Sequence, residues 1–577
     1  MNIEITKNVQ VPMRDGVSLA ADVYTVPASG ACPTVLLRVP YDKEMVAATP
    51  EVGRYLAAGY TVLVQDTRGR FASGGEFVPF AGEKQDGEDT LAWLERQPFC
   101  DGVVVMAGAS YFGATQWLAA AGNSPALAAI APMTTASSYY EGWSYRGGAL
   151  ELGFLLYWSL GILGLGGVGR AIATQRCEPA IFPALVAAID AMPAAYRRTP
   201  LTDVGNLADL VPYYLEWLAH PTDDEYWRST APRERYDAVT VPSLNIGGWY
   251  DCFLAGTLAN YRGMQLAGGS AAARRPRLVI GPWSHGMSLG EFPSGSYGLM
   301  ANSLVADLTG RQIRFFDRHA RGVDNGLDDE PPVSIFVMGA NVWRDELDWP
   351  PPGARPVSYY LHSAGGANTA AGNGELDTSP PGDEPADVFD YDPRDPVPTV
   401  GGPTFLPGFQ LAANAGPCDR RRVEERPDVL CFTSAPLAAD TEVIGPVSLV
   451  LFVRSSALDT DFTGALVDVH PDGRAVILTD GILRARYRNS VEHPELLEPG
   501  QIVELTVDLC ATANRFAAGH RIRLEVSSSN FPRFDRNSNT GGVLADEVES
   551  DYLVATNRVL HDRSHPSRLV LSVIDGL

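Results

Sequence analysis

The stretch Val103–Gly113, which reads VVVMAGASYFG, decides the fold class of this chain. An apolar, strand-like run ends in small residues around Ser110, and a helix-like run follows at 114–121. A serine on such a tight turn projects its hydroxyl beyond the edge of a sheet, and small neighbours are needed because the strand and the helix pass closely. Here those neighbours are Gly108, Ala109 and Gly113. The stretch predicts a nucleophile elbow, the alternative being an ordinary strand–helix turn capped by serine.

The regions on either side of this elbow alternate between strand-like and helix-like runs. Short apolar runs occupy 34–39 (TVLLRV) and 60–65 (YTVLVQ), and the helix-like stretch DGEDTLAWLER fills 86–96. Further strand-like runs lie at 243–246 and 277–280. Continuous apolar strands separated by helices predict an α/β fold with a mostly parallel sheet that is covered on both faces.

Two changes of pattern divide the chain. Residues 142–240 are rich in Ala, Leu and aromatic residues at helical spacing, which predicts a helical cap over the strand ends, where open α/β sheets bind ligands. A Trp349–Gly353 boundary (WPPPG) precedes short, partly alternating strands, which predict a sandwich of antiparallel sheets. The expected domains are an α/β-hydrolase catalytic domain at 1–141 and 241–350, the cap at 142–240, and an all-β domain at 351–577.

Charge and cysteine content narrow the range of partners. The chain carries 45 Lys and Arg against 69 Asp and Glu, a net charge of −24, which disfavours nucleic acid and anionic lipid as partners. Seven scattered cysteines favour reduced thiols in a cytoplasmic protein, although Cys418 and Cys431 lie close in sequence. No CxxC motif or histidine-rich cluster indicates a metal site, and we expect no cofactor.

Two segments bear on targeting and membranes. The first residues, MNIEITKNVQVPMRDG, lack a basic start followed by an apolar core, so no signal peptide is expected. The uncharged stretch Leu152–Gly169 reaches the length of a membrane span but holds six glycines. We predict a buried helix beside a pocket there and no membrane association.

The serine needs a base, since a hydroxyl at its normal pKa is a poor nucleophile. In α/β-hydrolases the triad follows the order Ser, Asp or Glu, His. Asp251 and His285 each end a predicted strand, in SLNIGGWYD and RLVIGPWSH, and follow Ser110 in that order. Asp66 and Asp101 compete for the acid role. Asp66 is expected to pair with a local arginine, and Asp101 precedes the serine in a turn, so Asp251 is preferred.

The motifs together resemble the CocE/NonD family of serine hydrolases, which is related to the X-Pro dipeptidyl peptidases. The resemblance rests on residues 38–43 (RVPYDK), 66–69 (DTRG), 108–113 (GASYFG), 248–251 (GWYD), 281–285 (GPWSH) and the C-terminal stretches 527–532 and 535–542. It covers the whole chain. It implies the same triad, a jelly-roll-like form for the β domain, and an oxyanion hole built from the backbone N–H of Tyr111 and the hydroxyl of Tyr41.

The resemblance also implies an aromatic acyl pocket. Its expected lining residues are Trp143, Trp158 and Phe253, with Phe405 and Leu406 added from the β domain. Such a pocket favours aryl or benzoyl esters through ring stacking. The segment 44–58 differs from the family and is expected to frame the alcohol side of the substrate, so the alcohol is left open.

Two rival functions remain beside a carboxylesterase. An acylase or proline-specific dipeptidyl peptidase would cleave an amide bond, but such enzymes usually need charged groups to hold a substrate amine or carboxylate. The run 247–257 offers no carboxylate besides Asp251. An interaction protein that works through the β domain would not need Ser110 at all. That domain is also a candidate surface for a homodimer.

Overall fold

A computed structural model describes residues 2–27, 30–406 and 414–574, and its first unit is a large sheet. Within the described residues this sheet has ten strands in the order β1-β2-β4-β3-β5-β6-β9-β10-β13-β14. The strands from β4 to β13 along this order run parallel, and the others are antiparallel. Their bounds are β1 Glu4–Pro12, β2 Ser18–Thr25, β3 Cys32–Val39, β4 Thr61–Asp66, β5 Cys100–Ala109, β6 Leu127–Met133, β9 Leu244–Tyr250, β10 Arg277–Ser284, β13 Val333–Val337 and β14 Val342–Glu346.

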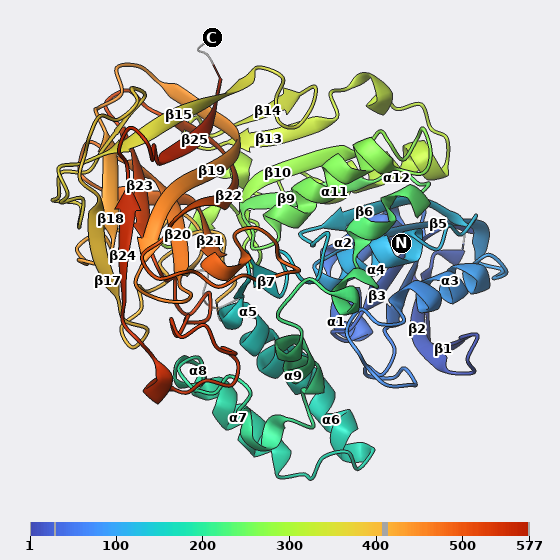
Figure 1. Cartoon of the computed structure of the whole chain (residues 1–577). Coiled ribbons are helices and arrows are strands. Elements are labelled where there is room, and N and C mark those ends of the chain that lie inside the picture. Colours follow the sequence, from blue (N-terminus) through green and yellow to red (C-terminus); the bar gives the residue numbers. More distant parts are fainter. Residues whose placement is uncertain (1, 28–29, 407–413, 575–577) are drawn as a thin grey trace.

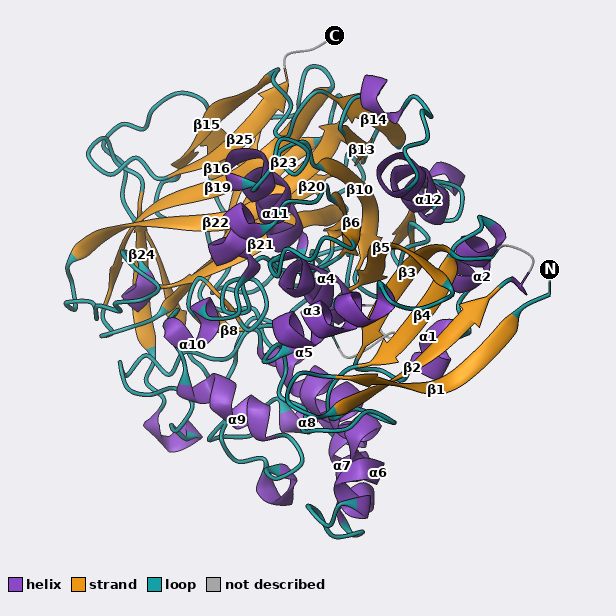
Figure 2. Cartoon of the chain, turned by 90° about the vertical axis from the view of Figure 1, so that its right-hand side faces the viewer, coloured by secondary structure: helices purple, strands orange, loops and turns teal. Residues whose placement is uncertain are grey.

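Helices cover both faces of this sheet because successive side chains of its strands are apolar on both sides. Met106 of β5 packs with α3, α4 and α11, whereas Val105 and Ala107 pack with α2 and α12. Figure 2 shows the sheet between these two groups of helices. The predicted α/β class is therefore confirmed. The helices are α2 Pro50–Ala57, α3 Glu83–Leu94, α4 Tyr111–Ala120, α11 Leu254–Ala267 and α12 Leu308–Ala320, with the short α1 Lys43–Ala47 after β3.

The chain between β6 and β9 forms a mainly helical region that projects away from the sheet (Figure 1). One helix of 22 residues, Leu152–Ala173, is long and apolar enough to cross a membrane, with a mean hydropathy of 1.6. In the structure 61% of its apolar window is buried inside the protein, so it packs as a core helix. The elements are β7 Tyr145–Arg146, β8 Ala149–Leu150, α5 Leu152–Tyr157, a π-helical segment Trp158–Gly164, α6 Leu165–Ala173, α7 Ile181–Asp190, α8 Met192–Ala195, α9 Pro212–Ala219 and α10 Glu225–Arg228.

The C-terminal part is all β, as predicted, and lies beside the sheet's β13 end (Figure 1). One continuous core joins the two parts, since Trp249 of β9 and Ile335 of β13 share a cluster with Leu449 and Leu509. The strands are β15 Ala354–His362, β16 Glu375–Asp377, β17 Asp387–Tyr391, β18 Leu430–Ser434, β19 Thr441–Ser455, β20 Asp461–Val469, β21 Ala475–Arg484, β22 Ile502–Phe516, β23 Arg521–Ser527, β24 Ala555–Leu560 and β25 Arg568–Ile574. The short β11 Glu291–Phe292 and β12 Gly295–Ser296 follow β10.

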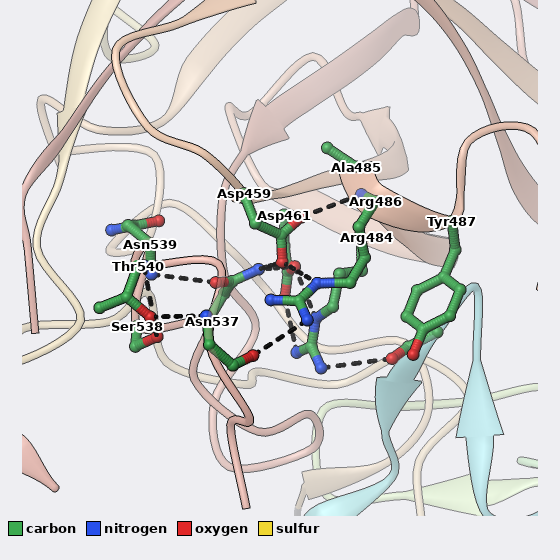
Figure 3. Close-up of polar contacts among 12 residues, drawn as sticks. Asp459, Asp461, Arg484, Ala485, Arg486, Tyr487, Asn537, Ser538, Asn539 and Thr540 are labelled. Atoms are coloured by element: carbon green, nitrogen blue, oxygen red, sulfur yellow. Dashed lines mark hydrogen bonds and ion pairs between the residues drawn. The ribbon is translucent and has the colours of Figure 1, made fainter. Parts of the chain in front are cut away.

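A buried polar network fastens the β part to the β7–β8 hairpin. Arg484 donates to Asp461 at 2.9 Å and to Asp535 at 2.7 Å, and it also reaches the carbonyl of Gly148 at 3.2 Å. Asn537 bridges Asp461 and a second carboxylate at 2.7 and 2.8 Å (Figure 3). Buried charges of this kind are stable only when they are paired and hydrogen-bonded, so the network fixes how the two parts meet.

None of the cysteines in the described residues forms a disulfide. Cys418 and Cys431, whose spacing invited pairing, are both buried and unbonded to each other. That the thiols are reduced in the cell stays a prediction.

Candidate active site

The elbow around Ser110 has the strained geometry that its sequence predicts. β5 ends at Ala109 and α4 begins at Tyr111, and Ser110 between them has φ 60° and ψ −125°. A positive φ is unusual for a residue with a side chain and is typical of functional turns. The serine therefore stands at the carboxyl end of the strand with its hydroxyl free to face a substrate.

Two glycines make this turn possible. At Gly108, with φ 123°, an added Cβ would lie 2.6 Å from the Cβ of Phe112. At Gly113 an added Cβ would lie 2.7 Å from the Cβ of Thr135, because α4 passes directly over the loop after β6. The second glycine thus stands three residues after Ser110, because α4 crosses the loop after β6 at that point.

The structure brings the three predicted triad residues together from three strand ends. The Nε2 of His285, which follows β10, lies 3.1 Å from the Oγ of Ser110. Its Nδ1 lies 2.8 Å from the Oδ1 of Asp251, which follows β9. The Asp251 side chain is fully buried and that of His285 is 9% exposed. This chain of contacts has the geometry of a nucleophile, a base and an acid that orients the base.

The two competing acids lie elsewhere in different surroundings. The expected pairing of Asp66 with a local arginine is wrong. Its carboxylate accepts hydrogen bonds from the backbone N–H groups of Lys43 and Ala72 at 2.9 and 3.2 Å. Arg68 instead binds Asp86 at 2.5 Å. Burial raises the pKa of Asp66 to about 6. Asp101 lies near the start of β5, at the opposite end of that strand from Ser110.

Tyr41 and Tyr111, predicted as oxyanion donors, both border Ser110. Tyr41 follows β3, and its hydroxyl accepts a hydrogen bond of 2.9 Å from the indole N–H of Trp158. Burial raises the pKa of Tyr41 to about 12, against the effect of hydrogen bonds with Trp158 and Ser110. The phenol of Tyr111 donates to Glu83 at 3.0 Å and accepts from the N–H of Phe80 at 2.8 Å. Its side chain is therefore held away from the nucleophile, while its backbone lies directly after Ser110.

The four aromatic residues predicted to line the pocket belong to one cluster, which contacts His285. Trp143 stacks on Phe253 with ring centroids 4.2 Å apart, and Phe253 meets the imidazole edge-on at 4.9 Å. Phe405 approaches the same imidazole at 4.9 Å, and Trp158 meets Trp143 at 5.3 Å. Leu406 packs against Gly153 of α5. Because Trp143 and Phe253 touch face to face, a substrate ring would contact the edges and outer faces of this cluster.

Some residues around the site could not be identified from the sequence. Phe154 and Trp217 both stack on Trp158, with centroids 5.5 and 5.6 Å apart, but apolar residues in helices carry no signal that separates a pocket from a core. Glu83, at the start of α3, is buried against Arg38 at 2.9 Å. Charged residues in helices usually face solvent, so nothing in the sequence indicates this pair.

Two groups of side chains in the described residues have the composition of metal ligands. One consists of Asp251, Cys252 and His285, which is the site itself, and the other of Asp468, His470 and His520 in the β part. In the first group the carboxylate and the imidazole already bind each other at 2.8 Å. The expectation that the reaction uses no metal stays a prediction.

Two family models match the two parts of the chain. Residues 15–287 match the model of the X-Pro dipeptidyl-peptidase (S15 family), and residues 325–570 match that of the X-Pro dipeptidyl-peptidase C-terminal non-catalytic domain. Cocaine esterase of Rhodococcus sp. (strain MB1 Bresler) is 44% identical over 579 residues, with 99% of each chain covered.

Solved structures share the whole architecture. An α-amino acid ester hydrolase is 25% identical with a TM-score of 0.82, and the match covers 99% of this chain and 96% of that one. An aminopeptidase from a Thaumarchaeota archaeon, 23% identical with a TM-score of 0.79, covers 100% of this chain and 97% of its own, and it shows the fold alone. The chain belongs to the CocE/NonD family of serine hydrolases and is a carboxylic ester hydrolase.

Proposed function

We propose that this enzyme hydrolyses esters through an acyl-enzyme formed on Ser110. His285 takes the proton of the serine hydroxyl as Oγ attacks the ester carbonyl, and it then gives that proton to the departing alcohol. Water, deprotonated by the same imidazole, attacks the acyl-enzyme; the bond to Ser110 breaks, the acid leaves, and His285 returns the proton to the serine oxygen. The observation that carries this proposal is the pair of contacts at 3.1 Å from His285 to Ser110 and 2.8 Å from His285 to Asp251.

The tetrahedral intermediate needs donors on its oxyanion. We assign that role to the backbone N–H of Tyr111 and the hydroxyl of Tyr41. The N–H group of a residue that follows the nucleophile at a helix N-terminus commonly serves this purpose, together with a donor from the loop after the neighbouring strand. Tyr41 occupies that loop, directly beyond β3.

The aromatic cluster supports an aryl acyl group, such as benzoyl, as the preferred substrate. Rings that meet edge-to-face gain about 0.5–1.5 kcal/mol beyond the area they bury. Trp143, Phe253 and Phe405 are 0, 1 and 6% exposed, so a bound acyl group would lie in apolar surroundings next to the imidazole. Esters are favoured over amides because an amide substrate with a free amine would need an unengaged carboxylate nearby.

The acidic groups beside the triad are engaged. Asp251 binds His285, and Glu151 accepts from Arg146 at 3.0 Å and lies 3.4 Å from Arg533. Burial raises the pKa of the thiol of Cys252, next to Asp251 in the chain, and the nearby charges of Asp251 and Glu151 add to this effect. A substrate ammonium group would have to displace one of these arginines, which disfavours the dipeptidyl-peptidase alternative.

Two measurements test the proposal. The kcat/KM for p-nitrophenyl benzoate should exceed that for p-nitrophenyl acetate, and Gly-Pro-p-nitroanilide should be cleaved far more slowly than either. Ser110→Ala should abolish turnover while the protein stays folded. Turnover that persists in Ser110→Ala would contradict the mechanism, and a strong preference for the acetyl ester or the anilide would contradict the substrate class alone.

A further inference from the structure

Trp158 contacts the site in two ways, through the packing of its rings and through a hydrogen bond. Its rings belong to the aromatic cluster, but its indole N–H donates to the hydroxyl of Tyr41 at 2.9 Å. We infer that Trp158 is a positioning residue that orients the Tyr41 hydroxyl so that its single hydrogen points at the oxyanion on the Ser110 side. This inference rests on the proposed function, because it needs Tyr41 to be an oxyanion donor.

The hydrogen atoms that the indole and the phenol can donate fix the direction of this bond. An indole N–H can only donate, whereas a phenol carries one hydrogen and can also accept. Once the Tyr41 oxygen accepts from Trp158, its own hydrogen must point elsewhere. The Ser110 side chain lies close enough to this hydroxyl to act on the pKa of Tyr41, against the larger effect of burial, so the Ser110 side is open to that hydrogen. The accepted bond also polarises the O–H group and makes it a better donor in surroundings that exclude water.

The indole is held so firmly that the bond keeps its geometry. Trp158 is 2% exposed and lies between Trp217, nearly parallel at 5°, and Phe154, tilted by 16°. Donors that are fixed before the reaction need no reorganisation when the charge develops, and this property makes an oxyanion hole effective.

A buried arginine connects the chain segments that carry the two partners. Trp158 begins the π-helical segment, in which Leu163 offers its carbonyl to the Nη1 of Arg70 at 2.9 Å. The Nε of the same guanidinium donates at 2.8 Å to the carbonyl of Pro40, the residue before Tyr41. π-Helical turns are rare and frequently lie at functional sites. Arg70 therefore sets the distance between the helix of Trp158 and the loop of Tyr41.

The neighbouring tryptophan shows that packing alone does not produce such a bond. Trp143 belongs to the same cluster and is 0% exposed. Its indole N–H has no hydrogen-bond partner within the part of the chain that the structure describes. Trp143 is thus a matched control: replacing either tryptophan by phenylalanine removes the same atoms from the cluster, but only at Trp158 is a bond to Tyr41 lost.

The test is a double-mutant cycle on kcat. Trp158→Phe should lower kcat about tenfold, less than the about 10²–10³ lost when an oxyanion donor is removed outright, because Tyr41 remains but is no longer oriented. The loss is measured with p-nitrophenyl acetate, because its small acyl group makes the least use of the aromatic cluster to which Trp158 also belongs. In a Tyr41→Phe background, Trp158→Phe should cost nothing further.

The control variant should behave differently. Trp143→Phe should change the acetyl and benzoyl rates unequally, and its effect should be of the same size with Tyr41 or Phe at that position. Circular dichroism of each variant reports whether it folds. If Trp158→Phe does not fold, Arg70→Lys tests the same connection. A lysine cannot bind the carbonyls of Pro40 and Leu163 at once, as the two-armed guanidinium does. The loss of kcat in Arg70→Lys should also vanish in the Tyr41→Phe background.

The outcomes separate the two proposals. If Tyr41→Phe keeps its kcat, the oxyanion role of Tyr41 fails and the inference falls with it. If Tyr41→Phe loses activity but the Trp158→Phe effect on p-nitrophenyl acetate persists in full in that background, the inference alone is overturned.

Discussion

Replacing Asp251 by asparagine removes one negative charge and leaves the shape of the site intact. The Asp251 side chain is fully buried, and its Oδ1 accepts the Nδ1–H of His285 at 2.8 Å. An asparagine amide would instead present its N–H groups to Nδ1. The imidazole would then carry its hydrogen on Nε2, 3.1 Å from Ser110, and could not take the serine proton.

The expected loss follows from this geometry. When Ser110 attacks, His285 becomes positively charged, and a carboxylate at about 4 Å stabilises that charge by about 4 kcal/mol at an effective dielectric of about 20. Such a loss corresponds to about 10³ in rate, and the unfavourable tautomer adds to it. We therefore expect kcat for Asp251→Asn to fall by about 10³–10⁴, in line with the same change in other serine hydrolases.

The assay is steady-state hydrolysis of p-nitrophenyl benzoate at pH 8, with circular dichroism to confirm folding. Asp101→Asn is the matched control, because Asp101 is an exposed aspartate on the same strand as the nucleophile but at its other end. It should leave kcat unchanged. A folded Asp251→Asn enzyme with kcat within about tenfold of the wild type would refute the assignment of Asp251.

Three further changes test other parts of the account. Because burial raises the pKa of Tyr41 to about 12, the hydroxyl keeps its proton as the pH rises, and kcat should stay level past pH 10. A fall in kcat with a midpoint near pH 10 that disappears in Tyr41→Phe would count against this expectation. Gly108→Ala should abolish activity or folding, because its Cβ would lie 2.6 Å from that of Phe112 at a φ of 123°; a fully active variant would contradict the elbow geometry. Arg484→Met leaves Asp461 and Asp535 buried without their partner and should cost about 3–5 kcal/mol in urea unfolding. Arg474→Met, which breaks an exposed pair with Asp472, should cost under about 1 kcal/mol, and equal losses for the two arginines would be inconsistent with a buried network.

The sequence predicts best the features that depend on local pattern and chain order. Apolar runs at 34–39 and 103–106 indicate parallel strands, and small residues around Ser110 indicate the elbow. Asp251 and His285 could be found because parallel strands end at one edge of a sheet, so residues just after them meet there. These contacts can be predicted once the order of the strands is known.

Features that depend on the exact direction of a side chain could not be predicted. The pairing of Asp66 was wrong because two arginines nearby in sequence point to other partners, Arg68 to Asp86 and Arg70 to backbone carbonyls. The bond from Trp158 to Tyr41 joins residues that are 117 positions apart, and a tryptophan in an apolar helix reads equally well as core. Tertiary packing decides both cases.

The central claim is that Ser110 forms the acyl-enzyme, and the most direct measurement is peptide mass spectrometry of enzyme quenched in acid during turnover of p-nitrophenyl benzoate. The account predicts a benzoyl adduct on the peptide that contains Ser110, appearing together with a burst of p-nitrophenol and absent from Ser110→Ala. A benzoyl adduct on another residue, or steady turnover in Ser110→Ala, would contradict it.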